Sequence, residues 1–146
     1  MFLMVAVIWS SNAFSWTTKF SDNPIRRSVP FEPWLEADSY CDPRTIFGQN
    51  VLELKSYTKQ NHTSNYIVGI VPSMDYRSIQ DRYGYWYALP IPTGYITDQS
   101  EAAVTFTALT YNMAAARIKS THYRYDTTYG VLLNLGQTNL TCFDTD

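Results

Sequence analysis

Short segments in which apolar and polar residues alternate, separated by turn residues, constrain this fold more than any other feature of the sequence. In residues 102–109 (AAVTFTAL), Val104 and Phe106 alternate with Thr105 and Thr107. A period of two is typical of a β-strand with one buried face. Similar segments end at Pro, Gly or Asn, residues that favour turns. The predicted strands are Tyr66–Val71, Tyr83–Leu89, Ala102–Leu109, Ala116–Tyr125 and Tyr129–Leu135.

Residues 42–59 have a helical pattern instead. Asp42 can cap a helix and Pro43 suits its first turn, where the missing N–H of proline costs nothing. The residues at helical spacing on one face are Ile46, Phe47, Val51, Leu54 and Thr58. We therefore expect an α+β fold, with one N-terminal helix packed on an antiparallel β-sheet. Residues 16–38 are polar and rich in proline, and we expect them to form an irregular arm with one short strand.

The beginning of the chain has the pattern of a secretory signal peptide. An apolar run at Phe2–Trp9 is followed by small residues that fit cleavage after Ala13 or after Ser15. A buried N-terminal strand is the alternative, but the polar Ser-Ser-Asn-Ala that follows the run argues against it. We expect residues 1–15 to be a signal peptide and residues 16–146 to form a single secreted domain. The apolar run is too short to cross a bilayer, so no membrane association is expected.

The two cysteines of the chain agree with export. Cys41 and Cys142 show no CxxC spacing and no histidine cluster that would indicate a metal site. In an oxidising compartment they are expected to form a disulfide bond that closes nearly the whole domain into one loop. In the chain-entropy model such a bond stabilises the fold by about 4–5 kcal/mol. The sequons Asn61-His-Thr and Asn139-Leu-Thr make Asn61 and Asn139 candidate glycosylation sites.

Few residues in the chain are suited to acid–base catalysis. His62 lies in a polar turn, and His122 alternates with Thr121 and Tyr123 on a predicted strand, where we interpret it as facing solvent. No GxSxG, HExxH or phosphate-binding loop occurs, and no pair of carboxylates stands out. From these motifs we predict that the protein is not an enzyme, has no catalytic residues and binds no cofactor.

Aromatic residues are concentrated in residues 83–95 (YGYWYALPIPTGY), which contain no acid or base. Strand alternation places Tyr85 and Tyr87 on one face and Trp86 on the other, where we expect it to pack in the core against the helix. Exposed tyrosines can anchor a protein partner or stack on nucleic-acid bases, although all these rings could equally serve packing alone. The net charge of −2 supplies no field that attracts RNA, so a protein partner is favoured. The predicted binding residues are Tyr85, Tyr87, Tyr95, His122 and Arg124.

The order of these elements resembles the small T1-type fungal ribonucleases and, more closely, the ribonuclease-like secreted effectors of powdery mildew fungi. The residues that carry the resemblance are Tyr87-Ala88-Leu89-Pro90-Ile91, Ala103-Val104-Thr105-Phe106 and the two terminal cysteines. It implies a scaffold without its active site, because Ala88 and Ala103 stand where the enzymes have a catalytic glutamate and arginine. Ser73 replaces a catalytic histidine in the same way. His122 corresponds to the last catalytic histidine in one alignment, whereas another alignment, through residues 130–132, leaves no counterpart.

The resemblance implies a secreted, non-enzymatic virulence effector of a fungal pathogen. Such a protein would be a monomer that binds a host plant protein, such as an immune receptor, or binds RNA without cleaving it, and so suppresses plant immunity. It could act outside the host cell or after translocation into it, with contacts expected in residues 72–82 and 92–100. Two alternatives remain open: a weakly active secreted ribonuclease that uses His122, and a disulfide-linked extracellular binding domain unrelated to ribonucleases. A fold without a helix over an antiparallel sheet would favour the second alternative.

Overall fold

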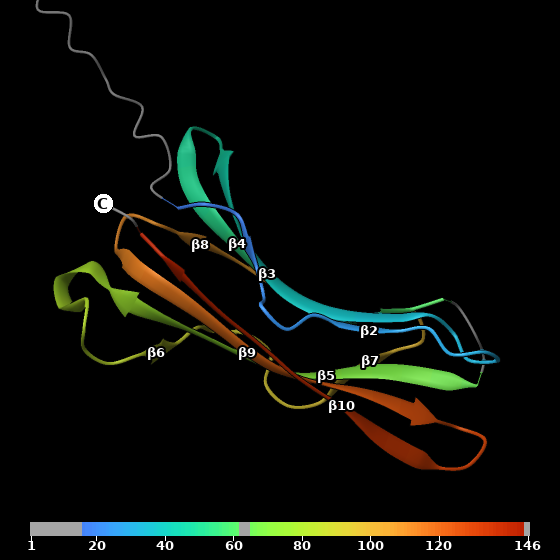
Figure 1. Ribbon diagram of the computed structural model, residues 1–146. Helices are drawn as coiled ribbons and strands as arrows, with labels where there is room; N and C mark the ends of the chain where they lie inside the picture. Colours follow the sequence, from blue (N-terminus) through green and yellow to red (C-terminus); the bar gives the residue numbers. More distant parts are fainter. Residues whose placement is uncertain (1–15, 62–64, 145–146) are drawn as a thin grey trace, which may run out of the picture.

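The chain folds into two antiparallel β-sheets that lie face to face and splay apart at one end, where the hairpin of β3 and β4 curls away (Figure 1). The computed structural model describes residues 16–61 and 65–144. The predicted signal peptide, residues 1–15, lies outside this range. The elements are β1 (Lys19–Phe20), β2 (Ile25–Arg27), β3 (Leu35–Ile46), β4 (Gln49–Gln60), β5 (Tyr66–Ser78), the 3₁₀ turn η1 (Ile79–Asp81), β6 (Tyr87–Ala88), β7 (Ile96–Asp98), β8 (Glu101–Leu109), β9 (Met113–Asp126) and β10 (Val131–Phe143).

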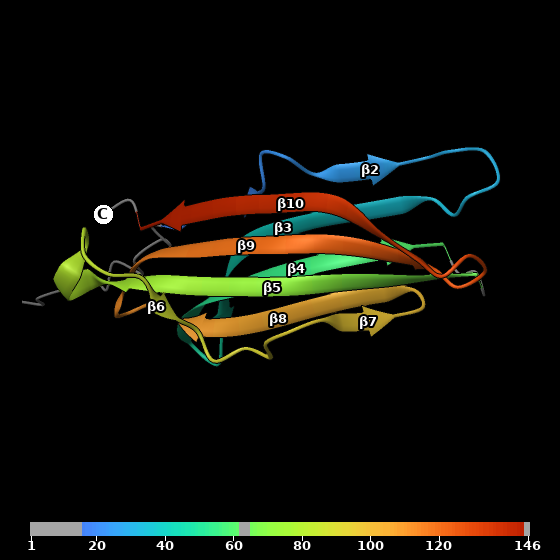
Figure 2. The same ribbon diagram turned by 90° about the horizontal axis from the view of Figure 1, so that it is seen from below.

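Each sheet has long strands at its centre and short strands at an edge (Figure 2). Sheet A has the order β1–β3–β4–β8, and β2 also pairs with β3. Sheet B has the order β10–β9–β5–β6, and β7 also pairs with β5. Because the sheets face each other, alternate residues of every long strand point into a shared core. The molecule is therefore an all-β sandwich.

The helix predicted for residues 42–59 is wrong, and the α+β class is corrected to all-β, because no α-helix occurs in residues 16–61 and 65–144. The segment forms the end of β3, a tight turn and most of β4, with Ile46 paired to Gln49. Phe47 and Gly48 between them have φ angles of 50° and 76°. Positive φ at both central residues is typical of a two-residue hairpin turn and ends any helix.

Burial along β4 explains why the helical spacing was misleading. The buried side chains follow a period of two through Leu52, Leu54, Ser56 and Thr58, as a strand over a core requires. The inward positions include Ser56 and Thr58, so the alternation is one of burial more than of hydropathy. The apolar residues that supported a helix included Phe47, which is fully exposed at the turn.

The strands predicted at 66–71, 102–109 and 116–125 are confirmed, with longer bounds in β5, β8 and β9. The strand predicted at 83–89 is reduced to β6, and that at 129–135 begins two residues later and continues to Phe143. Residues 16–38, expected to be an irregular arm with one short strand, contribute β1, β2 and the start of β3.

The core consists of two apolar clusters. One surrounds the cysteines and includes Leu52, Met74 and Ile118. The other lies towards the opposite end and is formed by Leu35, Val68, Ile70 and Ala102. Buried polar residues, described below, also lie between the sheets.

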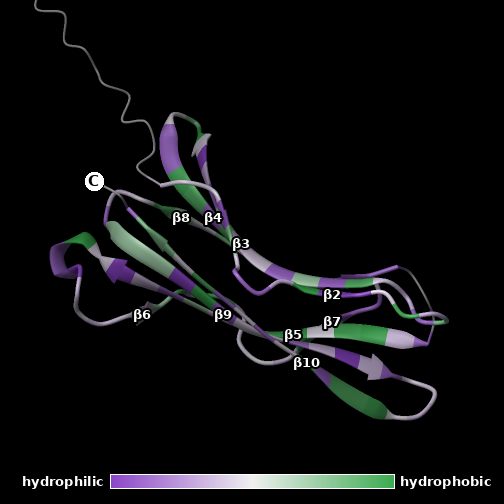
Figure 3. Cartoon of the chain, in the orientation of Figure 1, coloured by the Kyte–Doolittle hydropathy of each residue, from purple (hydrophilic) through white to green (hydrophobic). Residues whose placement is uncertain are grey.

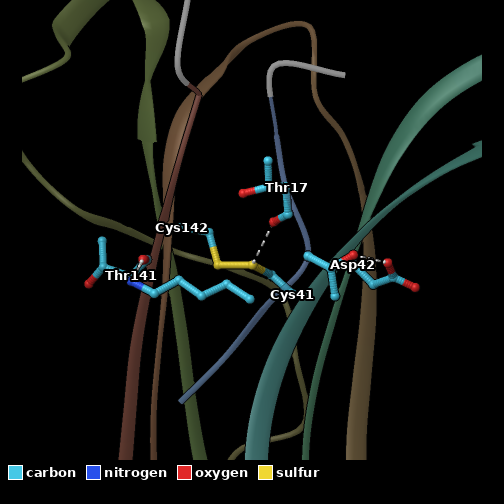
Figure 4. The surroundings of a disulfide bond; sticks show 7 residues. Thr17, Cys41, Asp42, Thr141 and Cys142 are labelled. Atoms are coloured by element: carbon cyan, nitrogen blue, oxygen red, sulfur yellow. Dashed lines mark hydrogen bonds between the residues drawn. A yellow bond between two sulfur atoms is a disulfide. The ribbon is translucent and has the colours of Figure 1, made fainter. Parts of the chain in front are cut away.

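The predicted disulfide bond between Cys41 and Cys142 is confirmed, and it joins the two sheets (Figure 4). Cys41 belongs to β3 of sheet A and Cys142 to β10 of sheet B, with their Cα atoms 6.8 Å apart. Both side chains are buried in the first apolar cluster. The bond therefore links distant parts of the sequence and ties one layer of the sandwich to the other.

Candidate functional site

His122 lies inside the sandwich, so the interpretation that it faces solvent is wrong. Its side chain is fully buried, and its ring nitrogens contact one hydroxyl from each sheet. Nδ1 lies 2.8 Å from Oγ1 of Thr58 in β4, and Nε2 lies 2.7 Å from Oγ1 of Thr138 in β10. Burial lowers the pKa of His122 to about 4, so the imidazole is neutral at physiological pH. In this position it cannot contact a substrate phosphate.

The hydroxyl groups around His122 form one continuous chain of hydrogen bonds. The Thr58 hydroxyl donates to the carbonyl of Gly69 at 2.9 Å, so it accepts the Nδ1–H of His122. Nε2 of the neutral ring then accepts from Thr138, whose oxygen lies 2.7 Å from the Ser39 hydroxyl. Ser39 in turn lies 2.8 Å from the hydroxyl of Ser56. Each polar atom along this path has a partner, which makes the buried polar chain compatible with a stable core.

Arg124 also points inward, and it is occupied by structural contacts. Its side chain is 2% exposed, and its guanidinium pairs with the carboxylate of Glu32 and donates to the Pro33 carbonyl at 3.3 Å. The same group lies 4.6 Å from the ring centroid of Tyr66. Arg124 therefore fastens the loop before β3 to sheet B, and with His122 it lies on the face of β9 that points into the sandwich.

Tyr95 lies on the outward face of sheet B, against Tyr123. The two rings meet edge to face with centroids 5.6 Å apart. A Cβ atom at Gly69 would lie 2.3 Å from the Tyr95 ring, so only glycine lets this ring cover β5. Burial, with a smaller contribution from Tyr123, raises the pKa of Tyr95, which therefore stays a neutral hydrogen-bond donor.

Next to Tyr95, an apolar row crosses three strands of sheet B. Tyr125 of β9 lies opposite Ile67 of β5 on one side and Leu132 of β10 on the other. A shallow hollow of about 340 Å³ opens between this row and Tyr95. Figure 3 shows hydrophobic colouring at the start of β10, where Leu132 lies. We call this surface the tyrosine face and define it as Ile67, Tyr95, Tyr123, Tyr125 and Leu132.

Trp86, which was expected in the core, lies instead on the outward side of sheet B. The guanidinium groups of Arg77 and Arg117 each lie 4.4 Å from the centroid of its ring. Arg117 is also paired with Asp75 at 2.9 Å. These contacts hold the segment between η1 and β6 against the sheet through cation–π attraction.

Tyr85 and Tyr87 do not join Tyr95 in one site. Tyr85 is 80% exposed in the loop before β6. Tyr87 is paired with Tyr76 across β6 and β5, with ring centroids 5.7 Å apart, and Tyr76 packs against the first apolar cluster. The predicted set thus divides into an inward pair, His122 and Arg124, and three exposed tyrosines that lie at separate positions.

Both candidate glycosylation residues are exposed. Asn61 follows β4, and the rest of its sequon lies outside the described residues. Asn139 lies in β10, and its backbone N–H donates to the side-chain oxygen of Asn23 at 3.1 Å. Glycosylation of either residue stays a prediction.

The residues that complete the tyrosine face were not identified from the sequence. Tyr123 and Tyr125 were assigned to a strand, but no face of that strand was identified as the binding side. Ile67 and Leu132 were missed because each becomes part of a surface only when three strands are placed side by side. The available signal was the Thr121, Tyr123, Tyr125 alternation, which marks one face of β9.

No family model, curated protein or solved structure matches the chain. Within the described residues, no helix is long and apolar enough to cross a membrane. The same part of the chain contains no group of three or more His, Cys, Asp or Glu side chains that could hold a metal ion. What the geometry defines is a disulfide-bonded β-sandwich with an aromatic outer surface.

Proposed function

We propose that the protein is a secreted, disulfide-bonded binding module that recognises another protein through the tyrosine face. The observation that carries the proposal is the contiguous row of Ile67, Tyr125 and Leu132 beside Tyr95 on a face turned towards solvent. Outward positions of a two-layer sandwich are usually polar. Tyrosine is favoured in interfaces because it offers a large apolar contact together with a hydrogen bond.

The ribonuclease scaffold is not part of this proposal, because residues 16–61 and 65–144 contain no helix packed on a sheet. The resemblance implied a helix packed on one sheet, whereas residues 16–61 and 65–144 form two sheets. This outcome favours the alternative of a disulfide-linked extracellular binding domain unrelated to ribonucleases. Secretion is supported by the inter-sheet disulfide bond, since such bonds persist in oxidising compartments. Action on a host plant protein, and virulence with it, stay predictions that depend on the resemblance.

RNA is the second candidate ligand, since the outward face of sheet B also carries Arg77, Arg117 and Lys119. Two of these cations are stacked on Trp86, and Arg117 is paired with Asp75. Because of these contacts and the net charge of −2, a protein partner is favoured. Retention of RNA that weakens steeply with salt and requires Lys119 would favour RNA instead.

The tyrosine face is tested by alanine substitution at its centre. We expect Tyr95→Ala and Tyr125→Ala each to weaken capture of the partner by about tenfold or more, since buried interface tyrosines are common anchors. Capture from extracellular fluid is followed by quantitative mass spectrometry and then by titration of the isolated partner. Tyr83→Ala is the matched control, because Tyr83 is 92% exposed and lies outside the tyrosine face. Equal losses for all three variants would contradict the assignment of this surface.

A further inference from the structure

We propose that the free edge of β8 is a docking site for an extended, uncharged segment of a partner protein, which adds to sheet A as a further strand. This surface is separate from the tyrosine face, so the proposal goes beyond the function inferred above. It is carried by the direction of the backbone groups of β8, by the residues along the edge and by the hollow beside it.

The backbone of β8 has hydrogen-bonding groups that face away from β4, its neighbour in sheet A. The backbone N–H of Gln60 donates to the Ser100 carbonyl at 2.9 Å, and the backbone N–H of Thr110 donates to the Asn50 carbonyl at 3.3 Å. These residues pair in the same register as β4 and β8, so the even-numbered residues of β8 bond to β4. Successive residues of a strand direct these groups to opposite sides. The residues that face outward are therefore Glu101, Ala103, Thr105, Thr107 and Leu109.

One outward group already has a partner, which supports this assignment. The N–H of Glu101 donates to the Asp98 carboxylate at 3.0 Å, on the side away from β4. For the four outward residues that follow, no strand pairs with them within residues 16–61 and 65–144. An unpaired row of N–H and C=O groups is completed by an extended backbone, which is how peptides add to a sheet edge.

The other long edge, that of β10, is protected against such pairing. A β-bulge interrupts it between Asn134 and Gly136. The Asn23 side chain donates to the Gln137 carbonyl at 2.6 Å and accepts the N–H of Asn139. Lys19 donates to the Thr141 carbonyl further along. Bulges, lysines and covering groups are the usual means of blocking an exposed edge.

Residues 102–109 of the β8 edge lack the bulge and the charged side chains that protect β10. Residues 102–109 (AAVTFTAL) contain no charged residue, proline or glycine, and the pairing of β8 with β4 has no register shift. A long, regular and uncharged edge readily accepts another strand. Since residues 102–109 carry no charge, the segment that pairs with them is expected to be uncharged as well.

A hollow of about 370 Å³ lies beside the second half of this edge. Its apolar lining includes Tyr76, Leu89, Phe106, Leu109 and Met113. Alternate side chains of an added strand would point towards this hollow. The expected segment therefore carries apolar side chains at every second position.

The surroundings of β8 favour a single segment over a second copy of the sandwich. β7 contacts β8, and in the view of Figure 2 the chain from β6 to β7 extends beyond β8 on the side away from β4, whereas Figure 1 shows it at the level of sheet B. If two copies paired through β8 about a two-fold axis, the β6–β7 chains of both copies would lie on the same side of the joined sheet. They would then compete for the same space. An isolated extended segment brings no second layer.

The probe for this site is a synthetic peptide with the sequence of residues 102–110 (AAVTFTALT) and a lysine at each end for solubility. It is uncharged between the lysines, alternates in polarity and lacks the β6–β7 chain. We expect saturable binding to the folded protein by fluorescence anisotropy. Amide hydrogen exchange at Thr105 and Thr107 should slow on binding, whereas exchange at Val104 and Phe106, which already bond to β4, should not change.

Thr105→Pro removes an outward N–H without removing a bond to β4, and it is expected to weaken peptide binding about tenfold. Thr105→Ser keeps the N–H and should bind like the wild type. If Thr105→Pro does not fold, the same test is made by N-methylating those amides of the synthetic peptide that would bond to β8. Absence of binding, or equal binding by both variants, overturns the proposal.

Comparison of Tyr125→Ala with Thr105→Pro separates the two proposals from one another. Tyr125→Ala should leave peptide binding unchanged, because the tyrosine face lies on sheet B. Loss of partner capture in Tyr125→Ala together with normal capture in Thr105→Pro would leave the proposed function intact and reject strand addition for that partner. Concentration-dependent dimers that Thr105→Pro abolishes would identify a second copy as the occupant and overturn the assignment to a partner segment.

Discussion

His122 shows how a single buried residue can make the stability of this fold depend on pH. Its folded pKa of about 4 lies below the usual value of about 6.5. Between these values the unfolded chain binds a proton that the folded chain excludes, so the free energy of unfolding decreases as the pH falls. The contribution is complete above about pH 6.5 and is lost by about pH 4, with a magnitude on the order of 3 kcal/mol.

Urea unfolding between pH 8 and pH 4, in the wild type and in His122→Gln, measures this effect. Carboxylates also titrate in part of this range, so the informative quantity is the difference between the two pH profiles. We expect the His122→Gln profile to be flatter by about the amount given above. His62→Gln, which replaces the other histidine of the chain, is the control and should keep the wild-type slope. Parallel profiles for His122→Gln and the wild type would contradict the neutral buried imidazole.

The side of β9 that faces the core could not be identified from the sequence. In residues 120–125 one face offers Ser120, His122 and Arg124, and the other offers Thr121, Tyr123 and Tyr125. Hydropathy favours burying the tyrosines, yet the structure buries the polar set. That choice depends on hydroxyl and carboxylate partners from β4, β10 and the loop before β3, which no local pattern reveals.

At the scale of elements, the turn between β3 and β4 contains an unfavourable residue. Phe47 has a φ of 50° and is fully exposed, so its ring gains no packing there. The left-handed conformation costs a residue with a bulky side chain about 1–2 kcal/mol, whereas Asn adopts it readily before Gly in this type of turn. We predict that Phe47→Asn raises the free energy of unfolding by about 1 kcal/mol, measured by urea denaturation.

Phe47→Ala provides the comparison for this prediction. It removes the same ring but keeps a side chain that disfavours positive φ, so it should change stability much less than Phe47→Asn. Equal stabilisation by both substitutions would mean that the exposed ring, and not the backbone conformation, is unfavourable.

The same turn explains why a hairpin was predicted as a helix. Apolar residues on both sides of a two-residue turn happened to recur at helical spacing, and Asp42 with Pro43 imitated a helix start. A short apolar run is ambiguous between helix and strand. By contrast, β8 was predicted with nearly its full bounds, because Thr and apolar residues alternate through it without interruption.

At the scale of the whole molecule, the disulfide bond is expected to contribute a large share of the stability. Cys41 and Cys142 are separated by 101 positions, and closing so long a loop restricts the unfolded chain by about 4–5 kcal/mol in the chain-entropy model. We predict that the double variant Cys41→Ser/Cys142→Ser loses about 3–5 kcal/mol in chemical denaturation. The wild type under reducing conditions should approach the same value, and an unchanged melting temperature after complete reduction would contradict this role.

The pairing of the cysteines could be predicted because only two are present. The candidate surfaces could not be predicted as a whole, since they combine β5, β9 and β10 in one case and β5, β8 and β9 in the other. The order of strands within a sheet is a property of long-range pairing, which turn signals and alternation leave undetermined.

The hydrogen-bonded path from Ser56 through His122 to Gly69 also limits how the two layers can shift. Apolar side chains tolerate small displacements, whereas each donor and acceptor in this path matches only one alignment of the layers. Sliding either layer by one residue would leave several of these atoms buried without a partner, at about 1–3 kcal/mol for each atom. The buried hydrogen bonds thus fix a single alignment of the two sheets, and the shape of both proposed contact surfaces depends on that alignment.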